Sequence, residues 1–195
     1  MKIAVDIDGV LLDIIVEYCK IFNERYGTNY KKKDVTDWEF FRDWNIDIKI
    51  AFEIFTVIYE DSMNVPFIDE DSIEIMQKLN KDQEVFIVTA RNPQYKKPVV
   101  KKLSSHNIKK GIQYEGIILL HHEPYDIKLE QHFDVYIDDN PNLVESIKLF
   151  EDRTLLLFDQ PWNQKSKCEK NVIRVYNWKD VYRKIRELEK KKLVN

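Results

Sequence analysis

The 195-residue sequence contains only two cysteines, fewer than a disulfide-stabilised secreted domain of this size normally carries. Cys19 lies in an apolar helical pattern and Cys168 in a polar stretch, and neither has a second cysteine at CxxC spacing. We therefore expect no disulfide and no zinc site. The sequence also lacks the apolar run of a signal peptide after Lys2, so we expect a cytoplasmic protein.

Long apolar runs and an excess of positive charge are missing as well. No stretch approaches 18 uncharged apolar residues, so we expect no membrane-spanning helix. The net charge is −3 with both signs interspersed, and the short run KKK at 31–33 is typical of a solvated segment. A nucleic-acid polymer is therefore not an expected partner. Glycine is scarce too, at four residues, which leaves little room for flexible linkers; the oligomeric state stays open.

Short apolar, β-branched runs alternate with helical patterns along the rest of the chain. The runs are mostly continuous, which is typical of strands buried on both faces. We predict strands at 2–5, 84–89, 116–120, 134–138, 154–158 and 171–176, and helices at 71–81, 92–107, 140–150 and 177–193. This alternation predicts an α/β fold: a Rossmann-like parallel sheet with helices on both faces.

One interval breaks the alternation. About 80 residues separate the first two strands, whereas a strand–helix–strand unit needs about 30. The surplus has helical patterns at 14–27, 34–44 and 46–62. We predict a small helical cap, residues 14–67, inserted into an α/β core domain made of residues 1–13 and 68–195.

Polar residues that could take part in catalysis or in ligand binding lie at the ends of the predicted strands. Ligands bind beyond the carboxyl ends of the strands in open parallel sheets, so these residues are expected to converge. They are Asp6 and Asp8 after the first strand, Thr89, Ala90 and Arg91 at the second, and Asp138 and Asp139 at the fourth, with Lys128 ten residues before Asp138.

Such a set suits phosphoryl transfer. Converging carboxylates repel one another unless a cation lies between them, and Mg²⁺ prefers oxygen ligands beside phosphate. Thr89 and Lys128 offer a hydroxyl and a cation for the oxygens of a phosphoryl group. One carboxylate can attack in line, and a second can protonate the leaving oxygen.

Four segments in this order resemble the motifs of the haloacid dehalogenase (HAD) superfamily of phosphohydrolases. They are DIDGV at 6–10, VTAR at 88–91, Lys128 and IDDNP at 137–141. The helical insertion directly after the first motif, and LLLFDQPWNQ at 155–164, resemble the cytosolic 5′(3′)-deoxyribonucleotidase branch and its bacterial relatives.

The resemblance implies a role for each acid. Asp6 would be the nucleophile that becomes an aspartyl-phosphate, and Asp8 the general acid and then the base. Mg²⁺ would be held by Asp6, the backbone carbonyl of Asp8 and Asp138, with Asp139 close by or bound through water.

The resemblance also implies how the phosphoryl group is bound. Thr89, Ala90 and Lys128 would hold its oxygens, and Lys128 would also orient Asp6. The branch leads us to expect Thr, a small residue and Pro in the second motif, where this chain has TARNP. Arg91 is therefore a candidate contact for the phosphate or ribose of a substrate.

The predicted function is Mg²⁺-dependent phosphomonoester hydrolysis, with a (deoxy)nucleoside 5′-monophosphate as the leading substrate. Three alternatives stay open: a phosphatase for sugar phosphates or nucleic-acid ends, a phospho-accepting receiver domain, and a non-catalytic binding domain. Trp38, Phe41 and Trp44 are spaced to share a helix face, which is more often core than binding site. Together with Phe67 they are candidates for a cap pocket that stacks on a base or sugar.

Overall fold

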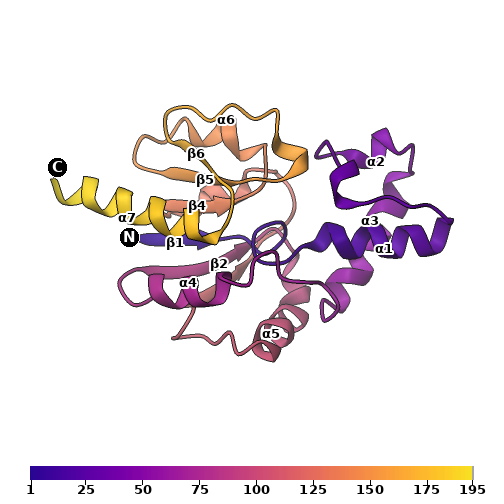
Figure 1. Ribbon diagram of the computed structural model, residues 1–195, viewed down its shortest axis with the longest axis horizontal. Coiled ribbons are helices and arrows are strands. Elements are labelled where there is room, and N and C mark those ends of the chain that lie inside the picture. Colours follow the sequence, from indigo (N-terminus) through magenta and orange to yellow (C-terminus); the bar gives the residue numbers. More distant parts are fainter. Residues whose placement is uncertain (195) are drawn as a thin grey trace.

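The computed structural model describes residues 1–194, with side chains through residue 192. Six parallel strands form one sheet in the order β3-β2-β1-β4-β5-β6 (Figure 1). The strands are β1 (Lys2–Val5), β2 (Glu84–Thr89), β3 (Gly116–Leu119), β4 (Val135–Asp138), β5 (Thr154–Phe158) and β6 (Val172–Val175). All six predicted strands are present, and the Rossmann-like α/β fold is confirmed.

Side chains that alternate along the strands bury both faces of the sheet. On one face Ile3, Val5 and Ile87 pack in the cluster that includes Met76 and Trp178. These last two belong to α4 (Ser72–Leu79) and α7 (Trp178–Val194). On the other face, strand residues such as Ala4 and Leu155 pack against α6 (Leu143–Ile147). The continuous apolar strands therefore form the middle of three layers.

The remaining core helices connect the strands. A short 3₁₀ turn, η2 (Pro93–Tyr95), leads into α5 (Lys96–Ser105), and a second, η3 (Ile127–Glu130), lies between β3 and β4. η4 (Pro161–Asn163) follows β5. Within residues 1–194, none of the helices has the length and apolarity needed to cross a bilayer.

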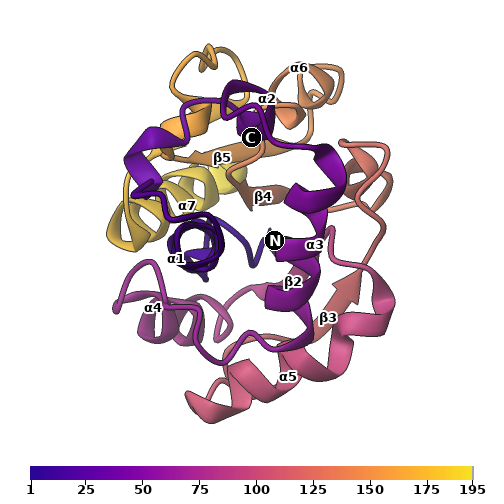
Figure 2. The ribbon, with the colours of Figure 1, turned by 90° about the vertical axis from the view of Figure 1, so that its right-hand side faces the viewer.

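Residues 14–67, here called the insertion, contain α1 (Ile14–Tyr26), η1 (Lys32–Asp34), α2 (Phe40–Asp43) and α3 (Ile48–Glu60). Figure 1 shows α1, α2 and α3 together beyond the carboxyl ends of the strands, on the side away from both termini. Figure 2 looks at this end, with α1 and α3 in front of the sheet. The insertion thus lies over the edge at which the candidate site residues were expected.

The helix expected over 34–44 is much shorter than predicted. The carboxylate of Asp37 accepts a hydrogen bond from the Glu39 amide at 3.2 Å. Such a local turn competes with a continuous helix. Asn45 ends the helical turn in the left-handed region at φ 52°. Trp38 therefore precedes α2 and Trp44 follows it, so these two do not share one helix face with Phe41.

The two crossings between insertion and core are tied to each other. Leu12 and Phe67 form an isolated antiparallel bridge. The Asp13 amide donates to the Pro66 carbonyl at 2.8 Å, and the Ile68 amide donates to the Leu11 carbonyl at 2.9 Å. The segment that enters the insertion, residues 11–13, is therefore bonded to the segment that leaves it, residues 66–68. We call this junction the base of the insertion.

Candidate active site

The strand order reverses between β1 and β4, and the site begins there. Val5 of β1 is in register with Ile137 of β4, so Asp6 lies beside Asp138. The Asp6 amide donates to the Ile137 carbonyl at 3.0 Å, which extends the ladder by one residue. In parallel α/β sheets this reversal is where ligands bind.

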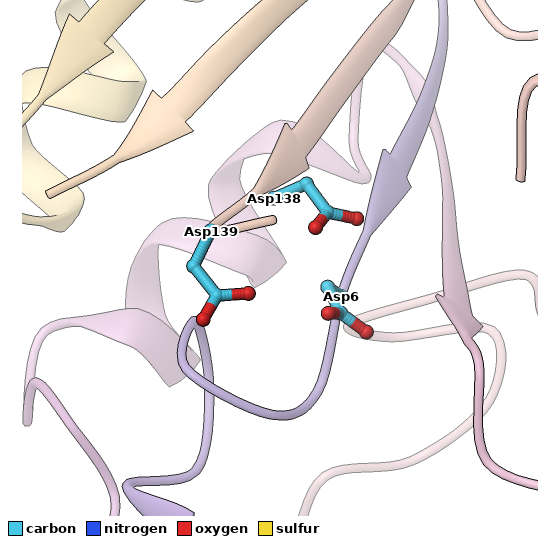
Figure 3. Close-up of side chains that lie close together, drawn as sticks. All are labelled: Asp6, Asp138 and Asp139. Carbon is cyan, nitrogen blue, oxygen red and sulfur yellow. The ribbon is translucent and has the colours of Figure 1, made fainter. Parts of the chain in front are cut away.

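Three carboxylates meet at this point. Asp6, Asp138 and Asp139 each offer an oxygen within 4.8 Å of the others, and all three side chains are buried. Figure 3 shows Asp6 beyond the end of β1, and Asp138 and Asp139 at the end of β4, with their carboxylates turned toward one another. Asp138 also accepts the Asn140 amide at 3.0 Å, which fixes its orientation. We call these three residues the carboxylate cluster.

Lys128 supplies the positive charge beside the cluster. Its Nζ lies 2.8 Å from Asp6 Oδ2 and 2.6 Å from Asp138 Oδ2, and it is also buried. Burial alone would lower the pKa of Lys128, but Asp138 and Asp6 outweigh it and raise that pKa. Burial raises the pKa of Asp6 to about 7, against the opposing effect of Lys128. Burial and the neighbouring Asp138 also raise the pKa of Asp139.

The charge balance of the cluster favours a divalent cation. Three carboxylates face one ammonium group, which leaves an excess of two negative charges when all are ionised. Buried charge of this kind is costly unless it is neutralised. Carboxylate oxygens are the ligands that Mg²⁺ prefers in proteins. The residues present therefore fit the predicted metal.

A glycine and a tryptophan place Asp139 in the cluster. Gly9 has φ +76°, and a Cβ there would lie 2.0 Å from Asp139 Oδ2, so the turn after β1 needs glycine. The Trp162 indole N–H donates to the same oxygen at 2.9 Å. Gln160 and Asn163 donate to the carbonyls of Gly9 at 2.7 Å and of Asp139 at 2.9 Å. The loop after β5 thus joins the two acidic loops.

Asp8 has a different partner. Its two carboxylate oxygens accept from Arg91 Nε at 2.8 Å and Nη2 at 2.6 Å, a bidentate pair. The Arg91 side chain is fully buried, while that of Asp8 is 19% exposed. The third bond of Arg91 goes to Ser62 Oγ at 2.7 Å, and its guanidinium carbon lies 4.6 Å from the Tyr59 ring centroid. Asp8 is therefore held by a core arginine that also contacts the insertion.

The other candidate residues of the second motif lie at the carboxyl end of β2. Thr89 is buried, and its Oγ1 accepts the Arg91 amide at 3.3 Å. Thr89, Ala90, Arg91 and Lys128 all line the same cavity as Asp6, Asp8 and Asp139. The structure therefore brings together residues from four separate stretches of sequence, and their roles as phosphate ligands stay a prediction.

This cavity has a volume of about 250 Å³ and lies between the sheet and the insertion. Much of its lining is aromatic. The insertion supplies the rings of Trp38, Phe40, Phe41, Phe52, Phe55 and Tyr59, and the core supplies those of Tyr95, Tyr125 and Trp162. A flat, apolar group of nucleobase size can pack against such rings.

Two of the four predicted pocket residues line the cavity and two do not. Trp38 and Phe41 do. Trp44 instead stacks on Tyr30, with ring centroids 3.8 Å apart. Phe67 packs at the base of the insertion, 4.6 Å from the ring of His106. Because the short α2 ends before Trp44, the spacing rule for a helix face fails there.

Comparison with known proteins identifies the family. The family model described as 5′ nucleotidase, deoxy (pyrimidine), cytosolic type C protein matches residues 1–193. The chain belongs to this family. The predicted membership of the HAD superfamily is confirmed, and the chain is a phosphatase, which disfavours the receiver-domain and non-catalytic alternatives.

Individual relatives agree with the family. A nucleotidase of Clostridium acetobutylicum is 27% identical over 186 residues, covering 93% of this chain and 92% of the relative. A 5′(3′)-deoxyribonucleotidase of Bacillus subtilis is 27% identical, with 94% and 97% covered. Among solved structures, a haloacid dehalogenase-like hydrolase of Streptococcus pneumoniae has a TM-score of 0.62 at 14% identity, covering 94% of this chain and 97% of that one. This last likeness shows the fold.

Proposed function

We propose that this phosphatase is a Mg²⁺-dependent 5′-nucleotidase that hydrolyses (deoxy)nucleoside 5′-monophosphates through an aspartyl-phosphate. The observation that carries the proposal is the buried carboxylate cluster with Lys128, facing an aromatic cavity. The cluster suits phosphoryl transfer, and the aromatic wall suits a planar base. The insertion would act as a cap that keeps bulk water from the site.

The proposed reaction has two steps. In the first, an Asp6 oxygen attacks phosphorus, the bond from phosphorus to the ester oxygen breaks, and Asp8 gives that oxygen its proton. In the second, a water oxygen attacks the phosphorus of the aspartyl-phosphate, Asp8 takes one proton of that water, and the bond from phosphorus to the Asp6 oxygen breaks, which frees the Asp6 carboxylate and inorganic phosphate. Lys128 and Thr89 hold the oxygens of the phosphoryl group in both steps.

Asp6, Asp138 and Asp139 would hold the metal ion. When bound, Mg²⁺ neutralises charge on the phosphoryl oxygens and on the cluster. The side chain of Asp8 does not belong to the carboxylate cluster, because it is bonded to Arg91. If Asp8 binds the metal ion as predicted, its ligand atom would be the backbone carbonyl oxygen.

A substrate panel with Mg²⁺ tests the substrate class. We expect nucleoside and deoxynucleoside 5′-monophosphates to be hydrolysed with kcat/KM about fivefold or more above that for sugar phosphates, since a stacked ring contributes about 1 kcal/mol. Equal rates on both classes would favour the sugar-phosphate alternative, and uniformly slow rates on all nucleotides would rule out a nucleotidase.

The nucleophile is tested by Asp6→Asn. We expect this variant to lose turnover of p-nitrophenyl phosphate and of nucleotides while staying folded by circular dichroism. Asp134→Asn is the matched control, because Asp134 precedes β4 at the opposite edge of the sheet, where it bonds to the Lys2 amide. Activity retained by Asp6→Asn would overturn the assignment of Asp6.

A further inference from the structure

Arg91 lines the cavity, and its observed partners differ from the substrate contact that the resemblance led us to expect. A residue that grips substrate needs free donors pointing into the cavity. Three of the five N–H groups of Arg91 already bond to Asp8 and Ser62, at 2.6 to 2.8 Å. Tyr59 covers a face of the guanidinium. Although Arg91 lines the cavity, most of its donors and one of its faces are already taken by protein partners.

The bidentate pair fixes the orientation of the Asp8 carboxylate. Each carboxylate oxygen accepts one N–H of the guanidinium, so the carboxylate is held in one plane beside Arg91. In the proposed reaction this carboxylate must face the leaving oxygen in the first step and the attacking water in the second, when the aspartyl-phosphate is hydrolysed.

The same arginine ties Asp8 to the insertion. Ser62 lies two residues after the last residue of α3, and its hydroxyl donates to the Ile58 carbonyl at 2.9 Å while it accepts from Arg91. Tyr59, which covers Arg91, lies in the last turn of α3. Asp8, Arg91 and the end of α3 thus form one connected unit, which we call the Arg91 bridge.

We infer that Arg91 is a positioning residue that holds the Asp8 carboxylate for hydrolysis of the aspartyl-phosphate and links it to the end of α3. This inference rests on the proposed function. It replaces the expected substrate contact with a contact to the base, so the consequences for kinetics differ. Loss of a substrate contact raises KM, whereas slow hydrolysis of a covalent intermediate lowers kcat and KM together.

Pre-steady-state kinetics with p-nitrophenyl phosphate separates the two steps. Its good leaving group needs little help from an acid, so the first step stays fast and p-nitrophenolate reports it. For Arg91→Met we expect kcat to fall about 10²-fold with KM falling in parallel, and a burst of p-nitrophenolate that approaches one per enzyme. Arg91→Lys should recover part of kcat. For Ser62→Ala, which removes one of the three bonds, we expect a loss of about tenfold or less with the same burst.

Lys102→Met is the control for damage to the base of the insertion. Lys102 is buried near Phe67 and bonds to the Met63 carbonyl at 3.0 Å, but it does not contact Asp8 or Arg91. We expect no burst in this variant. A raised KM without a burst in Arg91→Met would overturn the inference in favour of a substrate contact, and equal bursts in Arg91→Met and Lys102→Met would show a general effect of loosening the insertion.

Hydrogen exchange tests the link without catalysis. Coupling is reciprocal, so removing Asp8 must loosen the end of α3 just as removing Ser62 loosens Asp8. We expect Asp8→Ala to speed exchange of amides at 58–62 at least severalfold, and Lys102→Met to leave the loop at 7–10 unchanged. Unchanged exchange at 58–62 in Asp8→Ala would overturn the link. A wild-type enzyme that forms no phosphoenzyme would refute the proposed function and the positioning role, while a faster exchange would still establish the link.

Discussion

The cavity has two walls of different chemical character: one formed by the strand ends of the sheet, here called the sheet wall, and one formed by the insertion, here called the insertion wall. The sheet wall is charged: Asp6, Asp138 and Lys128 are buried and joined by bonds of 2.6 to 2.8 Å. The insertion wall is aromatic, and Phe52 within it is 42% exposed and touches neighbouring rings at centroid distances of 5.8 to 6.4 Å. Charged groups at fixed strand ends are suited to chemistry, whereas apolar rings, among them the half-exposed Phe52, are suited to recognition of a base.

This difference has a consequence for substitutions. Removing one partner of a buried charge pair leaves the other charge without compensation. Removing one ring from a set of rings costs only that ring's contact area. Changes in the sheet wall should therefore act on kcat and stability, and changes in the insertion wall on KM.

The largest effect is expected for Lys128→Met. Without Lys128 the three carboxylates have no ion pair with a lysine or arginine among the described side chains, and one proposed ligand of the phosphoryl group is lost. We expect kcat to fall about 10²–10³-fold, the usual cost of losing one such group. Without metal, the free energy of unfolding should fall by about 3–5 kcal/mol.

Thermal unfolding with and without Mg²⁺ sharpens this prediction. Because the variant has one more uncompensated negative charge, Mg²⁺ should raise its Tm more than it raises that of the wild type. Lys102→Met, which removes a buried lysine bonded to a neutral carbonyl, should show the Mg²⁺ response of the wild type. A smaller response in Lys128→Met would contradict the charge balance derived for the cluster.

A second prediction concerns pH in the metal-free protein. The folded-state pKa of Asp6 is raised to about 7, above its ordinary value of 3.8, mainly by burial. The folded state therefore holds this proton more tightly than the unfolded state does. The stabilisation is fully present below about pH 4 and is lost as pH rises through about 7.

Urea unfolding between pH 4.5 and 8 measures this dependence. In EDTA the free energy of unfolding should fall across this range, by roughly 4 kcal/mol at most from Asp6. Saturating Mg²⁺ should oppose the fall, because the ion prefers the ionised cluster. Asp6→Asn should show a flatter profile in EDTA than the wild type; an unchanged slope would assign the dependence to other groups.

The sheet wall was predictable from sequence, and the reason is local. An acid directly after a buried strand stays at the end of that strand, and the rule for ligand sites in parallel sheets brings such ends together. This rule brings Asp6 and Asp138 together, whereas Lys128 was expected there from its place in the ordered set of motifs; all three lie at one place. Trp162 follows β5 in the same way, so the same rule applied to DQPWN could have found it.

The insertion wall and its link to Asp8 were not predictable in this way. The core residues Asp8 and Arg91 are 83 residues apart, and Arg91 and Ser62 of the insertion are 29 apart, with no sequence period that links them. The stripe of Trp38, Phe41 and Trp44 assumed a continuous helix, which the turn at Asp37 prevents. Side chains of short helices and turns are placed by tertiary packing, and the local pattern does not contain that information.

The smallest effect is expected for Phe52→Ala in the insertion wall. The variant loses one ring of the cavity but no charged group, so kcat should stay within about twofold while KM for a nucleoside monophosphate rises about 3- to 10-fold. KM for glycerol phosphate, which has no ring, should change much less. Tyr26→Ala is the matched control: Tyr26 is an exposed aromatic residue of α1 that packs on Phe22 and does not line the cavity. A fall in kcat of Phe52→Ala comparable to that of Lys128→Met would remove the division between the two walls, because it would place chemistry on the insertion as well as on the sheet.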